Sequence, residues 1–149
     1  MKSIPFILRD HREQLWRGWT ESMDGHVPDD YRELMNSPLG ERHVRSFIDD
    51  LISWSEAESY EKPAAQRQAC DRVRADASNR MALGFTHADM VGSLHALRGA
   101  VVDVLLDALV LDELPSFAET LEQLKAASAF IDQLCVAVLE AAPPPREVF

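Results

Sequence analysis

The residues with the clearest capacity for chemistry lie together in the string His95-Ala96-Leu97-Arg98-Gly99. Arg98 falls inside a run of apolar residues that recur at helical spacing, and His95 lies at the edge of that run. A guanidinium in an apolar stripe must find a negative partner or extend to the solvent. If it does not extend to the solvent, Arg98 predicts either an ion pair with an acid on a neighbouring helix or a cation lining a small cavity. Such a cavity would bind an anion or the carboxylate of a partner.

The tryptophans Trp16, Trp19 and Trp54 are the next residues of interest. Their simplest role is in the core or at its edge, and the alternative is a ligand pocket walled by tryptophan. If the domain binds a small molecule, we expect the ligand-binding residues to be Arg98, His95, Trp16 and Trp19.

Other classes of site find no support in the sequence. It contains no HExxH, no Cys/His cluster of zinc spacing, no Glu-x-x-His pair for a two-iron site, no phosphate loop and no GxSxG. The carboxylates are spread over helix surfaces, as in a solvated acidic face. Among the histidines only His95 is a candidate haem ligand, and it lies off the centre of its stripe. We therefore expect a protein that is not an enzyme, with no catalytic residue, no metal and no cofactor.

The helix that positions His95 and Arg98 is predicted between residues 85 and 111. Thr86 has the character of an N-cap, Asp89 stands at the capping-box position, and Gly84 ends the preceding helix. Gly92, Ala96 and Gly99 form a second face of small residues on this helix. Such a face predicts the close approach of a neighbouring helix within the fold, and a dimer contact is the alternative.

Apolar residues at helical spacing predict four further helices, with a single turn over 31–35: 5–23, about 38–60, 63–83 and 117–142. Ser37 and Ser116 are expected N-caps, Pro38 and Pro63 suit the first turn of a helix, and Pro115 helps to end the long helix.

The helix over 63–83 has only a thin stripe, Ala69, Val73, Ala77 and Met81, and is expected on the outside of the molecule. No segment shows the alternation of a strand. The sequence thus predicts an all-α single domain of about five helices. It is either an antiparallel bundle or a globin-like (non-haem) arrangement with steeper crossings, and the spacing does not separate the two.

Composition limits the partners. The chain has 149 residues, 46% hydrophobic and 27% charged, with a net charge of −10. This acidity disfavours nucleic acid and anionic membranes, which require a basic surface. Cys70 and Cys135 form no CxxC pair and suit a reducing cytoplasm. The apolar run at the N-terminus is too short for a signal peptide, and no run approaches a membrane span. We expect a cytoplasmic protein in which residues 1–142 form the helical sensory or interaction domain and 143–149 a proline-rich tail or linker.

Three segments give the chain a family resemblance: FILRDHREQLWRGWTESM, SPLGERHVRSFIDDLISW and GFTHADMVGSLHALRGAVVDVL. Together with the Ser-Pro-x-Gly step at 37–40, they resemble the RsbRD N-terminal domain family, the sensory modules of stressosome co-antagonists and of some histidine kinases. The resemblance implies an all-helical, globin-like domain without haem. It also implies signal input to a phosphorylation-based or partner-switching pathway, through a signalling protein such as a kinase or receiver domain. It carries over no catalytic residue. Such domains usually precede an output domain, and the proline tail fits a linker to one.

Two alternatives stay open. The string at 95–99 is similar to the H-x-L-K-G motif of histidine phosphotransfer domains. In that interpretation His95 would carry the phosphate, Arg98 would stabilise it, and Gly99 would let a receiver domain approach. The other alternative is a structural dimerisation module, and a homodimer is expected in either a sensory or a structural role.

Overall fold

The computed structural model describes residues 3–111, 113–114 and 116–145. This part of the chain contains seven helices and no strand, so the fold is all-α. The helices are α1 (Ile4–Asp10), α2 (Arg12–Ser22), α3 (Asp29–Asn36), α4 (Pro38–Glu56), α5 (Lys62–Ala82), α6 (His87–Val110) and α7 (Phe117–Glu140). None of these helices combines the length and the apolar character needed to cross a membrane.

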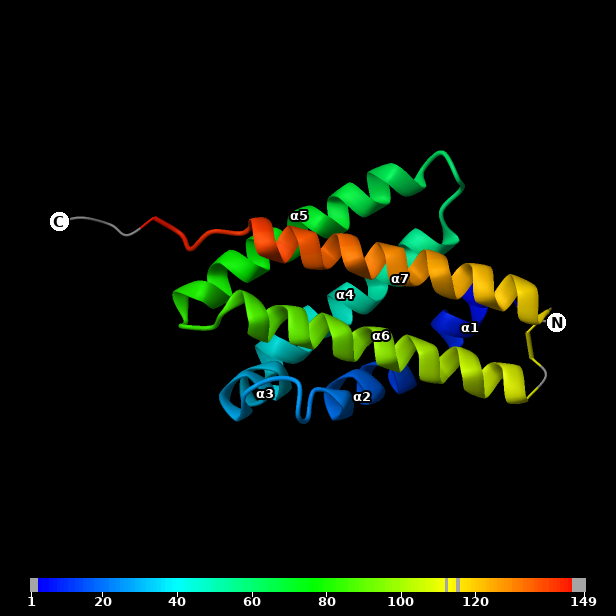
Figure 1. The fold of residues 1–149 in the computed structure, drawn as a ribbon, viewed down its shortest axis with the longest axis horizontal. Helices are drawn as coiled ribbons and strands as arrows, with labels where there is room; N and C mark the ends of the chain where they lie inside the picture. The colour runs from blue at the N-terminus through cyan, green and yellow to red at the C-terminus, as the bar shows by residue number, and fades with distance from the viewer. Residues whose placement is uncertain (1–2, 112, 115, 146–149) are drawn as a thin grey trace.

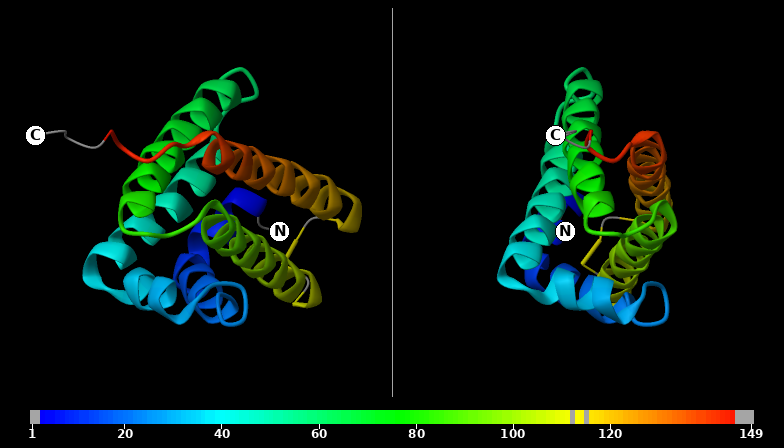
Figure 2. Two further views of the ribbon diagram at one scale, coloured as in Figure 1. Left: turned by 60° about the vertical axis from the view of Figure 1, so that its left-hand side comes forward. Right: turned by 90° about the vertical axis from the view of Figure 1, so that its left-hand side faces the viewer.

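The helices form two layers that cross obliquely (Figure 1, Figure 2). One layer holds α4 and α5, and the other holds α6 and α7 side by side. Helices α2 and α3 close one side of the molecule, while α1 packs against both α4 and α6. The arrangement is therefore closer to the steeply crossing alternative than to one bundle of nearly parallel helices.

The predicted N-caps are confirmed. The Ser37 Oγ accepts a hydrogen bond from the backbone N–H of Gly40 at 3.1 Å. Thr86 and Asp89 form both halves of a capping box, and the Ser116 Oγ accepts from the backbone N–H of Glu119 at 3.0 Å. Each cap satisfies an N–H that has no partner within its own helix. The predicted role of Pro115 lies outside the described residues.

The single helix predicted over 5–23 is wrong, because the chain breaks at His11 into α1 and α2. Residues on both sides of the break still turn apolar side chains inward, for example Leu8 and Leu15, so the hydrophobic spacing did not reveal it. The single turn predicted over 31–35 is a full helix, α3. These two differences turn the expected five helices into seven.

The second predicted helix ends at Glu56 and not at Tyr60. The segment after Glu56 adds further acids, which are unfavourable at the negative end of a helix dipole. The Lys62 ammonium donates to the Trp54 carbonyl at 2.7 Å and lies 4.5 Å from the centre of the Trp54 ring. A cation from the next helix thus satisfies a carbonyl at the end of α4.

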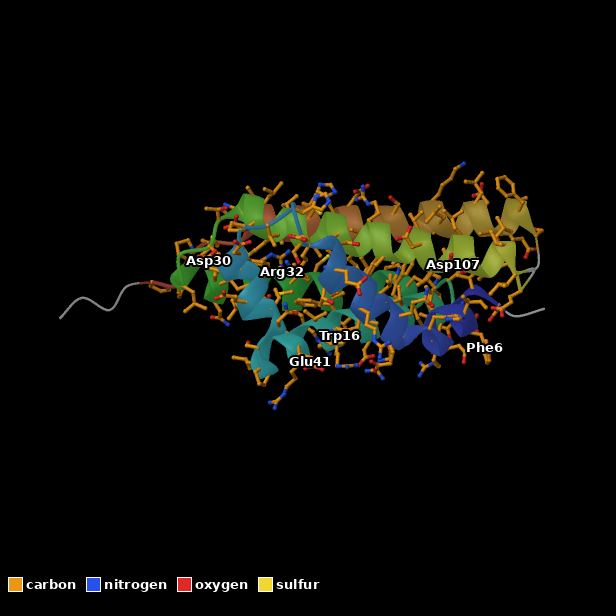
Figure 3. All side chains as sticks on the ribbon, turned by 90° about the horizontal axis from the view of Figure 1, so that it is seen from below. Phe6, Trp16, Asp30, Arg32, Glu41 and Asp107 are labelled. Atoms are coloured by element: carbon orange, nitrogen blue, oxygen red, sulfur yellow. The ribbon has the colours of Figure 1, made fainter. Side chains whose placement is uncertain are left out.

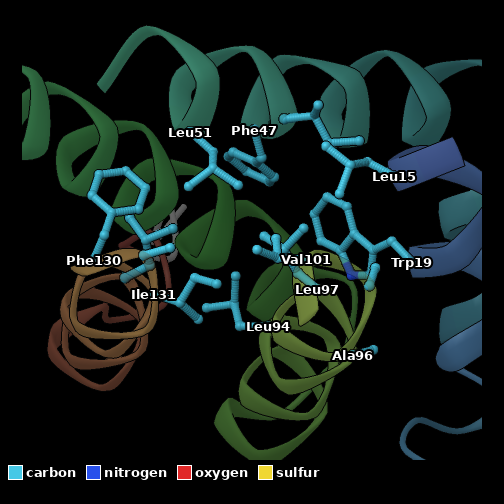
Figure 4. Close-up of a cluster of buried hydrophobic side chains, with 14 of the residues drawn as sticks. Leu15, Trp19, Phe47, Leu51, Leu94, Ala96, Leu97, Val101, Phe130 and Ile131 are labelled. Atoms are coloured by element: carbon cyan, nitrogen blue, oxygen red, sulfur yellow. The ribbon is translucent and has the colours of Figure 1, made fainter. Parts of the chain in front are cut away.

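The core forms where α6 meets α2, α4 and α7. Trp19 points from α2 toward Phe47 of α4 and toward Leu97 and Val101 of α6 (Figure 4). Its indole N–H donates to the Ser93 carbonyl at 2.7 Å. Helix α6 therefore lies at the centre of the fold, in contact with α1, α2, α5 and α7.

The face of small residues on α6 lies close to other parts of the chain, but only in part to a helix. Ala96 is buried, and a Cβ atom on Gly92 would lie 2.5 Å from the His26 carbonyl oxygen. A Cβ on Gly18 of α2 would lie 3.4 Å from the Cβ of Ala100. Gly99 differs, since nothing lies within 4 Å of the position its Cβ would take. The close approach of α2 is therefore seen at Gly18 and Ala100, while Gly92 lies against the loop that follows α2.

Candidate functional site

Arg98 lies partly buried in the seam between α6 and α7, where its Nη2 group pairs with the carboxylate of Asp132. This contact confirms the interpretation of Arg98 as one half of an ion pair with a neighbouring helix. Asp132 is exposed, so water screens much of the attraction between the two charges. A ligand-binding role for Arg98 stays a prediction.

The other residues predicted to bind a ligand lie in different surroundings. His95 is exposed. Trp16 lies under the Arg45 guanidinium of α4, whose carbon is 4.6 Å from the ring centre. Figure 3 shows Trp16, which belongs to α2, close to the label of Glu41 on α4. Asp107, labelled in the same view, shows where α6 lies. Trp19 is fully buried in the core. Of these residues, only Trp19 lines the inner cavity described below.

A second arginine, Arg80, is the most deeply buried charged group in the described part of the chain. It lies in the last turn of α5 and is only 5% exposed. Its Nε atom is 2.7 Å from the Asp76 Oδ2 atom, one helical turn earlier. Its Nη1 group donates to the Tyr31 hydroxyl at 3.0 Å. A charge removed from water in this way has to be paired, and Asp76 supplies the pair.

The pair belongs to a larger polar cluster that joins α3, α4 and α5. The second carboxylate oxygen of Asp76 is 3.3 Å from the Nδ1 atom of His43. Tyr31 packs edge-on against Phe85, with 5.0 Å between ring centres. Burial raises the pKa of the Tyr31 hydroxyl, which keeps this group protonated. We call Tyr31, His43, Asp76 and Arg80 the Arg80 cluster.

Two cavities flank the Asp76–Arg80 pair. The inner cavity, about 20 Å³ in volume, is bordered by Trp19, Tyr31 and Ser93 and by the pair itself. It has room for about one water molecule. The outer pocket has a volume of about 140 Å³ and opens to the solvent. Asp76 and Arg80 line both spaces, so the ion pair lies between the inner cavity and the outer pocket.

The outer pocket lies where α3, α4 and α5 meet. Besides the pair, it is lined by His43 and Asn79 and by three leucines, Leu34, Leu39 and Leu83. Gly40 shapes its wall, because a Cβ at this position would lie 2.0 Å from the Leu34 carbonyl oxygen. The Ser-Pro-x-Gly step thus caps α4 and lets it begin directly against the end of α3.

The last turn of α5 also holds the start of the C-terminal tail. The Ser78 hydroxyl donates to the Ala142 carbonyl at 2.6 Å. The Nε2 atom of His87, at the start of α6, lies 2.9 Å from the Ala141 carbonyl oxygen. The tail therefore leaves the domain beside the turn from α5 to α6 (Figure 1). The end of α5 therefore borders the outer pocket through Asn79 and Arg80 and contacts the tail through Ser78.

Comparisons with models of protein families, with curated proteins and with solved structures find no match for this chain. The resemblance to RsbRD N-terminal domains therefore stays a prediction, and the site has to be interpreted from its own geometry. Among the described residues no group of three or more His, Cys, Asp or Glu is placed to hold a metal ion. Burial raises the pKa of both Cys70 and Cys135, which disfavours the reactive thiolate.

A second notable surface is the outward side of α6 and α7. Of the eleven large apolar side chains exposed in the described structure, seven belong to these helices or to the residue that follows α6. They are Leu106, Val110, Leu111, Phe117, Leu121, Val136 and Leu139. We call this set the α6–α7 apolar face; its members are spread along both helices, and Leu106 also borders the groove toward α2. A contact with another protein on these two helices would bury this exposed apolar surface.

Sequence reasoning missed the Arg80 cluster because α5 is rich in both arginine and aspartate, which hides one buried arginine among exposed ones. A signal was nevertheless present. The thin stripe of Ala69, Val73 and Ala77 continues at helical spacing to Arg80 as well as to Met81, and Asp76 stands four residues before Arg80. The structure buries Arg80 and leaves Met81 only partly buried.

Proposed function

We propose that this chain is a non-enzymatic signal-input domain of a bacterial phosphorylation or partner-switching pathway. A small molecule binds in the outer pocket over the Arg80 cluster. The domain passes the event to a signalling protein such as a kinase or receiver domain. The observation that carries this proposal is a buried ion pair with a cavity on each side, in the same turn of α5 that holds the tail.

The physical argument for signalling is that this pair costs free energy to bury. A buried ion pair is often less stabilising than apolar residues of the same volume. Its presence beneath an open pocket is thus better explained by a role in binding than by stability. A ligand that alters the contacts of Arg80 also shifts the last turn of α5, and with it the hydrogen bond from Ser78 to Ala142.

A metabolite screen monitored by thermal unfolding tests the proposal. A ligand that binds the folded state raises the melting temperature, and the stabilisation grows as RT ln(1 + [L]/Kd). We expect at least one class of small molecule to stabilise the protein, and the substitution Leu83→Ser in the pocket wall to reduce the shift. A broad screen without any stabilising compound would contradict the proposal.

A second candidate function is histidine phosphotransfer by His95. Two observations favour it: the imidazole is exposed, and the space beside Gly99 on the same side of α6 is open. Against it, the Arg98 guanidinium is already paired with Asp132. Incubation with a phosphorylated receiver domain tests this function. Phosphate must be transferred to the wild-type chain, and the transfer must be lost in His95→Gln.

A third candidate, a structural dimerisation module, is favoured by the α6–α7 apolar face. In this case the chain is a homodimer in which two copies of the face pack together. Light scattering tests it: Leu106→Asp with Leu139→Asp should give a monomer, whereas Tyr60→Ser, an exposed aromatic on a distant loop, should leave the dimer intact. A wild-type protein that is already monomeric removes this candidate.

A further inference from the structure

We infer that the outer pocket binds a small monocarboxylate with a short apolar chain. The carboxylate contacts Arg80, and the leucines around the pocket cover the chain. This inference rests on the proposed signal-input function and names the chemical class of its ligand.

The polar end of the pocket fits a carboxylate. Both hydrogen bonds that Arg80 donates within the described residues leave from Nη1, one to Tyr31 and one to the Met35 sulfur. Its Nε atom faces Asp76. A guanidinium carries five N–H donors, so donors on Nη2 are left for a ligand in the pocket that Arg80 lines. His43 and Asn79 stand at the same pocket and add further donors.

The existing partners of Asp76 disfavour a cationic ligand. Each oxygen of Asp76 already has a partner, Arg80 on one side and His43 on the other, so a cationic ligand would have to displace one of them. A doubly charged phosphate would double both its attraction to Arg80 and its repulsion from Asp76, so the second charge gives it no clear advantage over a monoanion. A single carboxylate matches the planar guanidinium and can accept two parallel hydrogen bonds from it.

The apolar end of the pocket requires a hydrocarbon chain. Leu39 is 59% exposed and Leu83 is 65% exposed, although both lie around a pocket with a charged floor. A ligand chain packed on them would remove apolar surface from water on both sides. The volume of about 140 Å³ also exceeds what a bare ion fills.

Titration of the full chain with isocaproate, followed by ¹H–¹⁵N NMR, tests the inference. We expect saturable shifts at the amides of Leu39, Gly40 and Leu83 and at the Asn79 side-chain amide, and none at Gly99 on α6. Isocaproamide lacks the charge and acetate lacks the chain, so each should bind at least about tenfold more weakly. Inorganic phosphate should produce no saturable shift at these positions.

Two variants locate the binding. The double substitution Leu39→Ser with Leu83→Ser changes only exposed side chains, and we expect it to weaken isocaproate binding about tenfold while the fold persists. Val110→Ser, at an 82% exposed valine on α6, is the matched control and should bind as the wild type does. Arg80→Lys should also lose at least about tenfold. If that variant does not fold, the leucine variant decides alone.

The inference is overturned if isocaproate gives no saturable shifts, if isocaproamide binds as tightly, or if the leucine variant binds as the wild type does. Its failure can be told apart from that of the proposed function. If a compound of another class stabilises the protein and this effect is lost in the leucine variant, the carboxylate assignment falls and the signal-input function stands. If no compound of any class stabilises the protein, both fall.

Discussion

Removing Asp76 should destabilise the fold far more than removing Asp132, although each carboxylate pairs with one arginine. Asp76→Ala leaves Arg80, only 5% exposed, without its counter-charge. Breaking a buried pair from one side costs about 3–5 kcal/mol. The side chain of Asp132 is 61% exposed, so Asp132→Ala should cost less than about 1 kcal/mol.

Urea unfolding followed by circular dichroism measures the difference. With a slope of about 2 kcal/mol per molar urea, Asp76→Ala should lower the midpoint by about 2 M and Asp132→Ala by less than about 0.5 M. The double variant Asp76→Ala with Arg80→Met removes the stranded charge and should recover at least half of the loss. Its remaining deficit reflects the Tyr31 hydroxyl, which loses the donor Arg80.

The reasoning is refuted if Asp76→Ala unfolds at the same urea concentration as Asp132→Ala, since Arg80 would then be solvated in the folded state. It is also refuted if the double variant loses the sum of what Asp76→Ala and Arg80→Met lose separately. The reasoning assigns most of the loss in Asp76→Ala to the unpaired charge of Arg80, which the double variant no longer has.

Two further predictions follow from local geometry. Gly40→Ala should lower the free energy of unfolding by at least about 2 kcal/mol, because its Cβ would lie 2.0 Å from the Leu34 carbonyl oxygen. Gly99→Ala has open space around its Cβ and should raise the free energy of unfolding by about 0.5–1 kcal/mol. Urea unfolding compares the two variants. In Tyr60→Phe the remaining tyrosine, Tyr31, should ionise above its ordinary pKa of 10.0 when absorbance at alkaline pH is followed. The unfolded chain then releases this proton first, so stability should fall as pH rises above about 10, and less steeply in Tyr31→Phe. An ionisation midpoint at or below 10 would show that Tyr31 is not buried.

The parts of the fold that sequence reasoning found are those fixed by local chemistry. Ser37, Thr86 and Ser116 cap helices because a side-chain oxygen next to free N–H groups is favourable whatever the rest of the chain does. The apolar spacing over 85–111 is long enough to identify the helix α6. Arg98 could be assigned an acidic partner because a charge in an apolar stripe has few alternatives.

What sequence reasoning missed depends on contacts between distant segments. His11 interrupts the first helix without disturbing its apolar spacing, so nothing local marks the break. Arg80 is buried only because Tyr31 of α3 and His43 of α4 come together over α5. The preceding arginines of α5, such as Arg67 and Arg72, are exposed, so the composition of the helix alone does not single out Arg80. The outer pocket could not be placed for the same reason, since its walls come from three helices.

The contact of Trp19 with Ser93 joins residues that are 74 positions apart, and it lies at the centre of the fold. A ribosome that adds about 5–20 residues per second needs roughly 4 to 15 s to make the intervening chain. During that time the apolar side of α2 has no α6 to cover it. The nascent chain therefore passes through a period in which apolar surface of α2 that the folded protein buries is exposed to the solvent. Fragments that stop before α6 should stay unfolded however well their helices are capped.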